Sequence, residues 1–343
     1  MKIKENVDIK KYTTFKIGGK FRYFFIIRSE EDLNKAFLFA KEKKIEIFVL
    51  GGGSNLIFPD RILNVLALKM EIKGFEILKE TKKNVDIKIG AGEIWDKIVE
   101  RTVGMNLSGL EFLSLIPGTV GATPVQNVGA YGCEVKDTIL SVNVFDISRS
   151  KLISFSNVGC KFSYRDSIFK KINNKGKYII ISVVFRLNKN KPKVPDYPGV
   201  AKYLEGKGIK NPGLVDIRQA IIQIRRSKLP NPKRIANAGS FFKNPIITKN
   251  MFYKIIKTNK KNIDIPHFFI GDNKVKIPAG WLIEQAGFKG KSLGKISVYN
   301  KNALVLVNSN GATQKELIKA KDKIIQKVYK DFGIKLEQEP EMI

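Results

Sequence analysis

The chain has 343 residues, 43% of them hydrophobic and 10% aromatic, and its 62 Lys or Arg against 32 Asp or Glu give a formal net charge of +30. This composition excludes a disordered polyelectrolyte, and the length suffices for two or three domains with substantial cores. No apolar run reaches the roughly 20 residues that a membrane-spanning helix needs, and the polar start lacks a signal-peptide core. We therefore expect a cytoplasmic protein with no membrane partner.

The first half of the chain is predicted to mix helices and strands, with glycine turns at the ends of strands. Ser29 and the acidic residues after it favour a helix start, and apolar residues at 3.6-residue spacing follow as far as Ala40. A buried strand over 45–50 runs into the glycine-rich segment 51–55. The other expected elements are a strand over 85–89, a helix over 94–103 closed by Gly104, and strands over 139–147, 151–156 and 178–187.

The second half begins with a change in composition. Residues 188–213 are rich in Lys, Pro, Gly and Asn, which is typical of a linker or mobile loop, and we place the main boundary there. Beyond it, a stripe of Ile and Ala over 217–224 predicts a helix. Thr313 and Glu316 form the capping-box pattern of a long helix that ends at Gly333. We expect residues 334–343 to form a strand.

The positive charge leaves two interpretations open. Phosphate neutralisation would suit a nucleic-acid-binding protein. However, the lysines are scattered through every segment, and short runs such as 41–44 and 257–261 do not alternate with aromatic residues as a base-stacking surface would. We favour a lysine-biased surface and expect no specific nucleic-acid partner. A basic nucleic-acid-binding protein remains an alternative.

Two glycine clusters carry the first chemical signal. The segment Gly51-Gly-Gly-Ser-Asn55 follows a strand, where backbone N–H groups can approach a phosphate. Alone, such a segment is more often only a turn. A second cluster over 116–132 places several glycines among small residues, with Gln126 and Asn127 able to bond a polar ring edge. Because so many glycines cost conformational entropy, they indicate that a ligand approaches the backbone closely. Two such loops fit a dinucleotide better than a single phosphate.

Three polar side chains stand among apolar residues and are candidates for chemistry. Ser240 precedes Phe241 and Phe242, and the only histidine, His267, has no evident partner, so a Ser-His-Asp triad is not available. We interpret Ser240 as a proton donor or binding group. Arg165 and Glu339 are ligand contacts or members of structural ion pairs. No metal site is expected, because the two cysteines have no Cys or His nearby.

In this order, these segments closely resemble the UDP-N-acetylenolpyruvoylglucosamine reductase family, and specifically its longer class. The landmarks span nearly the whole chain. They are Thr14-Phe-Lys-Ile-Gly18, Gly51-Gly-Gly-Ser-Asn55, Gly109-Leu-Glu-Phe-Leu-Ser-Leu-Ile-Pro-Gly-Thr-Val-Gly121, Gln126-Asn-Val-Gly-Ala-Tyr-Gly132, Tyr164-Arg-Asp-Ser167, Lys228-Leu-Pro230, Ala238-Gly-Ser-Phe-Phe-Lys-Asn-Pro245, Ala279-Gly-Trp-Leu-Ile-Glu284 and Leu336-Glu-Gln-Glu339.

The resemblance implies an α+β fold. Its first part would be an FAD-binding fold of the vanillyl-alcohol-oxidase (PCMH) type over 1–190, made of two α+β subdomains divided near 60–70. Residues 191–213 would be a linker and a loop that carries Tyr197, suited to a lid over the substrate. Residues 214–343 would form a C-terminal α+β substrate-binding domain, whose last helix and strand could return to the first subdomain.

The resemblance also implies the ligands. The protein would bind FAD non-covalently, take reducing equivalents from NADPH, and reduce UDP-N-acetylglucosamine enolpyruvate to UDP-N-acetylmuramate in peptidoglycan biosynthesis. Reduced FAD would give hydride to C3 of the enolpyruvyl ether, and a proton would reach C2. We expect a monomer. The residues implied to hold FAD are Gly51, Gly52, Gly53, Ser54, Asn55, Gly118, Gly121, Gln126, Asn127 and Gly129.

Three catalytic roles follow from the resemblance. Arg165 and Glu339 would stabilise the negative charge that builds at C2 and on the substrate carboxylate, and Glu339 would need a proton or a shared hydrogen bond to do so. Ser240 would donate the proton to C2. Tyr197, Lys228, Asn244 and, as a weaker candidate, Arg225 would bind the UDP-sugar. An oxygen-using FAD oxidase of the same fold is the alternative, although the flavin-binding half has no histidine for covalent attachment.

Overall fold

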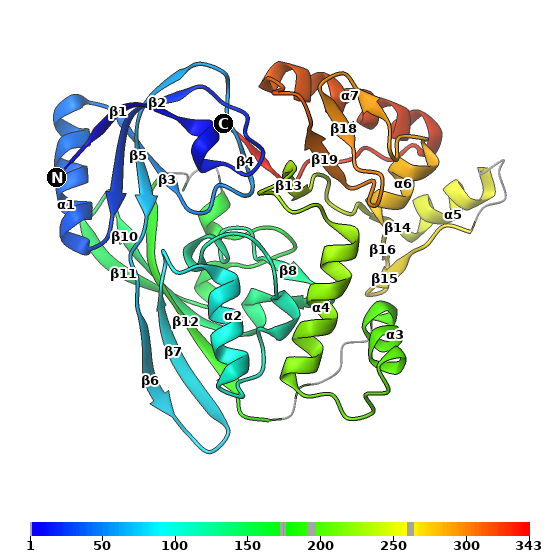
Figure 1. Ribbon diagram of the computed structural model, residues 1–343, viewed down its shortest axis with the longest axis horizontal. Helices are drawn as coiled ribbons and strands as arrows, with labels where there is room; N and C mark the ends of the chain where they lie inside the picture. Colours follow the sequence, from blue (N-terminus) through cyan, green and yellow to red (C-terminus); the bar gives the residue numbers. More distant parts are fainter. Residues whose placement is uncertain (1, 172–173, 175, 191, 193–196, 259–263) are drawn as a thin grey trace. The chain divides into compact units, whose positions relative to one another are not determined.

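The computed structural model describes residues 2–171, 174, 176–190, 192, 197–258 and 264–343. The chain forms two compact units, each assembled from separate segments (Figure 1). The first unit comprises Met1–Val7, Phe21–Gly53 and Ile62–Arg225, and the second comprises Asp8–Lys20, Ser54–Arg61 and Arg226–Ile343. The expected functional boundaries at 190 and 213 do not coincide with this division, and they stay predictions.

A four-stranded sheet holds the N-terminal part of the first unit. Its order is β1 (Lys4–Asp8), β2 (Lys20–Ile27), β5 (Ile62–Met70) and β3 (Glu46–Leu50). Helix α1 (Glu30–Lys43) begins where expected, because the Ser29 side chain accepts a hydrogen bond from the Asp32 N–H. Leu33, Ala36 and Ala40 are its buried residues. Strand β3 pairs in parallel with β5, so both strands end at the same edge.

A five-stranded antiparallel sheet forms the rest of the first unit's framework. Its order is β11 (Lys151–Ser156), β10 (Ile139–Asp146), β12 (Tyr178–Asn188), β7 (Asn84–Gly90) and β6 (Phe75–Glu80). Helix α2 (Trp95–Gly104) follows β7 and buries Trp95, Ile98 and Val99 in the core that both sheets share. The predicted helix over 94–103 and the four predicted strands of this region are confirmed within one or two residues.

The expected linker contains a helix, which corrects the interpretation of 188–213. Helix α3 (Pro198–Gly206) begins after Tyr197, with Pro198 at its first position, where the missing N–H is not needed. Val200 and Leu204 pack against Ile217 and Ile221 of α4 (Leu214–Lys228). The Lys- and Pro-rich composition hid these few apolar contacts. Residues 191 and 193–196 of the expected loop lie outside the described residues.

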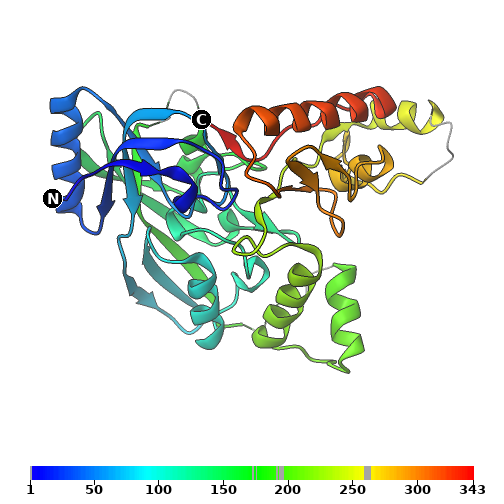
Figure 2. The ribbon, with the colours of Figure 1, turned by 45° about the horizontal axis from the view of Figure 1, so that its top comes forward.

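The second unit is built on a four-stranded sheet with the order β13 (Ala236–Ser240), β19 (Val305–Asn308), β18 (Ile296–Val298) and β17 (Ser292–Leu293). Helices α6 (Ala279–Gln285) and α7 (Gln314–Phe332) contribute residues to its core. Figure 2 shows α7 as the long helix drawn in orange to red. The predicted capping box is present: Thr313 accepts from the Glu316 N–H, and Glu316 accepts from the Thr313 N–H. Gly333 ends the helix in the left-handed conformation.

The C-terminal segment does not form the continuous strand expected over 334–343. Its regular part is β20 (Glu341–Met342), which pairs in parallel with β4 (Leu56–Ile57). Before it, Gln338 makes an isolated bridge to Phe242. Pro340 separates the two, because it has no N–H to donate to a ladder. Strand β20 therefore pairs with residues 56–57, which also belong to the second unit.

A small sheet inserted in the second unit has the order β14 (Ile246–Thr248), β16 (Lys274–Lys276) and β15 (Phe268–Ile270), with α5 (Lys249–Thr258) beside it. His267 packs on Phe252, with ring centroids 4.5 Å apart, and Ile265 O lies 2.8 Å from its Nδ1. The single histidine is thus part of a packed aromatic cluster. The remaining short elements are β8 (Gly129–Ala130), β9 (Cys133–Glu134) and the 3₁₀ turns Ile9–Tyr12, Glu111–Leu113, Val120–Ala122, Val135–Asp137, Val158–Cys160 and Ile168–Lys170.

No helix within the described part of the chain is both long enough and apolar enough to cross a membrane.

Candidate active site

The two glycine clusters meet in the first unit. A Cβ atom on Gly52 would lie 2.7 Å from the Cα atom of Gly118, and one on Gly51 would lie 2.8 Å from Oγ1 of Thr119. Contacts this close mean that only glycine fits at these positions. Gly53 has a φ angle of 62°, which also favours glycine. The expectation that both clusters serve one ligand is therefore compatible with the fold.

The second glycine cluster closes the N-terminal end of α2. The Trp95 N–H donates to the Gly118 carbonyl at 3.1 Å, and the Gly121 N–H donates to the Ala91 carbonyl at 2.9 Å. A Cβ on Gly121 would lie 2.6 Å from the Cβ of Ala91, so this glycine lets the loop pack on the end of β7. Part of the glycine content thus serves packing and does not need a ligand to explain it.

Asn127 is fully buried, and its side chain is bound by the protein. Its amide nitrogen donates to Oε2 of Glu134 at 2.9 Å and to the Ser163 carbonyl at 3.0 Å, and its Oδ1 accepts from the Lys136 N–H at 3.2 Å. Its φ angle of 46° places it in the left-handed region, which Asn tolerates. Asn127 therefore supports the loop, while Gln126 lies beside it in the preceding turn. Their contact with a cofactor stays a prediction.

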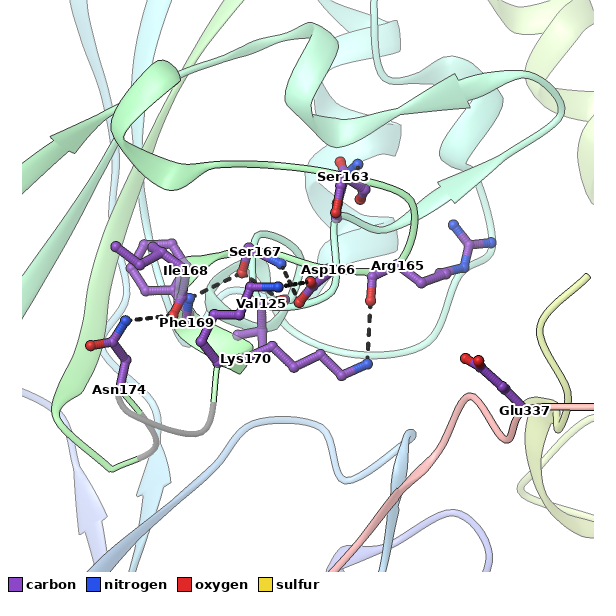
Figure 3. A network of polar contacts seen from close by, with 12 residues as sticks. Val125, Ser163, Arg165, Asp166, Ser167, Ile168, Phe169, Lys170, Asn174 and Glu337 are labelled. Carbon is purple, nitrogen blue, oxygen red and sulfur yellow. Dashed lines mark hydrogen bonds and ion pairs between the residues drawn. The ribbon is translucent and has the colours of Figure 1, made fainter. Parts of the chain in front are cut away.

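Arg165 lies at the tip of a tight turn closed by two backbone hydrogen bonds between Ser163 and Asp166, each 3.1 Å long (Figure 3). Its φ angle of 55° is uncommon for a side chain with a Cβ, and such strain is concentrated at functional sites. The guanidinium donates to the Gly129 carbonyl at 2.7 Å. The hydroxyl of Ser167 donates to the Val125 carbonyl at 2.6 Å and ties the turn to the second glycine cluster.

Tyr197 and Arg225, which are expected to bind the substrate, form a cluster with Tyr131, which the sequence did not single out. The rings of Tyr131 and Tyr197 meet edge to face, with centroids 4.9 Å apart. Burial raises the pKa of Tyr131, and Arg225 opposes this shift. The pKa of Arg225 is lowered by burial, and Tyr131 and Asp96 oppose this shift without cancelling it. Tyr131 stands in the landmark segment 126–132, so its position in that motif was the available signal.

A partly buried ion pair supports this cluster. The guanidinium of Arg218 donates to Oδ1 of Asp96 at 2.7 Å, and the side chain of Arg218 is only 8% exposed. Burial alone would raise the pKa of Asp96, but hydrogen bonds from Arg218 and the Leu115 N–H hold it below its usual value. The carboxylate therefore stays charged and can compensate Arg225, which lies seven residues after Arg218 on α4.

In the second unit, the chain brings Ser240 and Glu339 together although 99 positions separate them. The Glu339 N–H donates to the Phe241 carbonyl at 2.9 Å, and the Lys243 N–H donates to the Glu337 carbonyl at 2.9 Å. On each segment the donor and the acceptor are two residues apart, as in an antiparallel ladder. Ser240 directly precedes Phe241, whose carbonyl accepts from Glu339, and is half-buried. Its neighbours Phe241 and Phe242 are fully buried and fix the segment.

Two further candidates brace this part of the second unit. The Asn55 amide donates to the Glu339 carbonyl at 3.4 Å, and the Asn55 carbonyl accepts from the Glu341 N–H at 2.9 Å. Oδ1 of Asn244 accepts from the Ala279 N–H at 2.9 Å, at the start of α6, so its amide group is the part that could face a ligand. Ser54 lies next to Asn55, and Lys228 is the exposed last residue of α4.

Comparisons with known proteins decide the family. Residues 231–343 match the family model described as the C-terminal domain of UDP-N-acetylenolpyruvoylglucosamine reductase. The reductase of that name from Flavobacterium johnsoniae is 42% identical over 344 residues, covering 100% of both chains. The chain belongs to the UDP-N-acetylenolpyruvoylglucosamine reductase family. The family member from Bdellovibrio bacteriovorus is 40% identical and is covered to 99%.

The expected fold is also confirmed. Residues 21–156 match the model of an FAD binding domain, and the protein is therefore an FAD-binding flavoprotein. The crystal structure of the family member from Thermus caldophilus superposes with a TM-score of 0.69 at 21% identity, covering 100% of this chain and 99% of that one. The described residues fit a flavin dinucleotide, because Gly51, Gly52 and Gly118 leave the backbone bare and the buried Thr119 hydroxyl has no partner in the described structure.

The two cysteines are expected to be unreactive in the folded protein. Burial raises the pKa of Cys133 to about 11, and burial raises the pKa of Cys160 to about 12. Since the thiolate is the nucleophile, alkylation by iodoacetamide at pH 7.5 should be much slower than for a free thiol and should accelerate as the pH rises. Mass spectrometry of the folded and the urea-unfolded protein measures this. Equal labelling rates in the two states would contradict the prediction.

Proposed function

We propose that this protein reduces UDP-N-acetylglucosamine enolpyruvate to UDP-N-acetylmuramate in peptidoglycan synthesis, with NADPH as the reductant. The observation that carries the proposal is the full-length match to the reductase family together with the pairing of Glu339 with Phe241, the residue that follows Ser240. FAD, when bound, would accept hydride from NADPH and deliver it to C3 of the enolpyruvyl group.

Ser240 and Glu339 would manage the proton and the charge at the other carbon. As C3 gains hydride, negative charge builds at C2 and on the carboxylate of the substrate, so donors already in place stabilise the transition state more than the ground state. The Ser240 hydroxyl would give its proton to C2. Glu339, held by its N–H on Phe241, would contribute a hydrogen bond on the same segment pair.

Arg165 would stabilise the substrate carboxylate with its fixed positive charge. The strained turn and the bond to the Gly129 carbonyl limit the positions that the guanidinium can take. This preorganisation matters because a charge that is already oriented costs no rearrangement during the reaction. Arg165 would therefore bind the substrate carboxylate and stabilise its charge, and Ser240 would transfer the proton.

The UDP-sugar would be bound by a combination of cations, rings and amides. Lys228 and Arg225 would pair with its diphosphate, because guanidinium and ammonium groups are the preferred partners of phosphate oxygens. Tyr197, packed on Tyr131, offers an aromatic face, and Asn244 offers an amide donor. Tyr131 joins this set on the strength of its contacts with Tyr197 and Arg225.

A purified sample tests the proposal directly. We expect a yellow protein that oxidises NADPH only when the UDP-enolpyruvyl sugar is present and that converts the sugar to a product heavier by two hydrogens. Acid precipitation should leave a colourless pellet and a yellow supernatant, as for a non-covalent flavin. Oxidation of a substrate at the expense of oxygen, with release of hydrogen peroxide and no need for the sugar, would instead support the oxidase alternative.

We also propose a cytoplasmic monomer. Size-exclusion chromatography with light scattering should give a mass near 38.7 kDa. A mass twice that value would contradict the monomer and would leave the reaction itself untouched.

A further inference from the structure

A lysine that neither the sequence nor the comparisons single out lies at the entrance of the first glycine cluster. Lys69 is near the end of β5, where the parallel pairing with β3 places it opposite Leu50. Leu50 is the last residue of β3, and Gly51 follows directly. The Lys69 ammonium donates a hydrogen bond to the Gly51 carbonyl.

This hydrogen bond fixes the direction of a backbone donor. In a trans peptide the C=O and N–H groups point in opposite directions. Because Lys69 binds the Gly51 carbonyl, the N–H of Gly52 in the same peptide points away from the lysine. A side chain on the neighbouring strand therefore sets the orientation of this N–H. A dinucleotide phosphate would accept a hydrogen bond from the same N–H.

The charge of Lys69 has no counter-ion in the described structure. Within the described part of the chain, the Gly51 carbonyl is the only hydrogen-bond partner of the ammonium, and no carboxylate lies within ion-pair distance. Burial lowers the pKa of Lys69, with Glu71 acting to raise it and Lys73 to lower it. An ammonium held in these surroundings without an anion costs free energy, which an anionic ligand would offset.

A second group points to the same place from the other glycine cluster. The Thr119 hydroxyl is buried without a partner, and it lies 2.8 Å from the position that a Cβ on Gly51 would occupy. An unsatisfied buried hydroxyl is uncommon and calls for an explanation. The peptide that Lys69 orients thus lies close to both an uncompensated cation and an unused donor.

We propose that Lys69 is a positioning residue for the flavin cofactor: it orients the Gly51–Gly52 peptide and supplies positive charge for the diphosphate of FAD. The inference rests on FAD as the cofactor, and it does not depend on which reaction the flavin serves. It concerns the diphosphate only, so the flavin ring itself should be insensitive to Lys69. Riboflavin carries the same ring system without phosphate, so its affinity separates contacts with the ring from contacts with the diphosphate.

The chain offers a matched control. Lys73 also donates to a glycine carbonyl, that of Gly92, at 2.6 Å, but it has Glu93 as a counter-ion at 3.5 Å and does not bind the Gly51–Gly52 peptide. Lys73→Met therefore removes one lysine and one lysine-to-carbonyl bond without touching the proposed contact. Lys69→Arg keeps the charge and the donor, and Lys69→Gln keeps a donor without the charge.

The experiment measures flavin affinity of the full-length protein by ultrafiltration, without NADPH or sugar. Lys69→Met should weaken FAD binding about 10- to 100-fold, the loss typical of one hydrogen bond to a charged group. Its riboflavin affinity should equal that of the wild type. Lys69→Arg should restore most of the FAD affinity, Lys69→Gln should restore a minor part, and Lys73→Met should bind FAD as the wild type does.

Three results would overturn the proposal. The first is wild-type FAD affinity in Lys69→Met. The second is an equal loss for FAD and riboflavin, because Lys69 would then merely support the fold. The third is an equal loss in Lys73→Met, because net charge alone would then explain the effect. If Lys69→Met fails to fold, the comparison of Lys69→Arg with Lys69→Gln decides the same question. Because these affinities are measured without the sugar, they can be interpreted even if the protein fails to reduce it.

Discussion

Ser240→Ala is expected to slow the reduction of the enolpyruvyl sugar by about 10²- to 10⁴-fold, the usual contribution of a positioned proton donor. The rate at which NADPH reduces the flavin should not change, because that step moves no proton to C2. The substitution removes one oxygen atom from a half-buried position, while Phe241 and Phe242 keep the segment in place. The loss should therefore appear in the rate constant and not in the fold.

Anaerobic stopped-flow absorbance separates the two steps. The flavin is first reduced with NADPH, and the reduced protein is then mixed with the sugar. Ser309→Ala is a suitable control, because this exposed serine follows β19 in the same unit and carries no proposed role. Undiminished reoxidation in Ser240→Ala would remove Ser240 from the mechanism, and an equal loss in the control would show that the assay reports stability.

The helices and strands that were predicted well are those whose signals are local. Ser29 and the Thr313–Glu316 pair cap their own helices, so a few neighbouring residues suffice to predict where α1 and α7 begin. Strand β5 was missed, and its place between β2 and β3 in the sheet is set by tertiary pairing. Helix α3 was hidden by a Pro- and Lys-rich composition, although two buried residues hold it against α4.

The candidate site shows the same limit. The glycine clusters could be recognised in the sequence because their composition is unusual, but their meeting depends on tertiary packing of Gly52 on Gly118. Lys69 could not be found, since one lysine among 62 basic residues carries no signal until its partner is known. The pairing of Glu339 with Phe241, next to Ser240, likewise needs the structure. Ser240 and Glu339 stood out in the sequence as polar residues among apolar ones, and their catalytic roles came from the family resemblance.

Most of the +30 charge needs no ligand. Many lysines are exposed, so water solvates their charge. The exposed pairs, such as Lys35 with Glu31 and Lys97 with Glu100, do not change this net charge. Such exposed pairs contribute little to stability. The basic residues that bear on function are the few that are buried or held in place, namely Lys69, Arg165 and Arg225.

Gly52→Ala is expected to weaken FAD binding about 100-fold, because overpacking a rigid contact costs about 3 kcal/mol at the upper end of its usual range. The new Cβ would lie 2.7 Å from the Cα of Gly118 and 3.3 Å from its carbonyl carbon. Both are backbone atoms, which cannot turn aside as the end of a flexible side chain can. The two glycine clusters would have to separate, and the donors they present would lose their alignment.

Gly104→Ala provides the control for this effect. Gly104 is the last residue of α2, and a Cβ there would meet nothing within 4 Å. Alanine favours a helix over glycine by about 1 kcal/mol, so this variant should be as stable as the wild type or slightly more so, and it should purify with bound flavin. A Gly52→Ala protein that retains stoichiometric FAD would show that the contact between the clusters is not needed for binding. If the Gly52→Ala protein is folded but colourless while the Gly104→Ala protein is yellow, cofactor binding depends on that backbone contact.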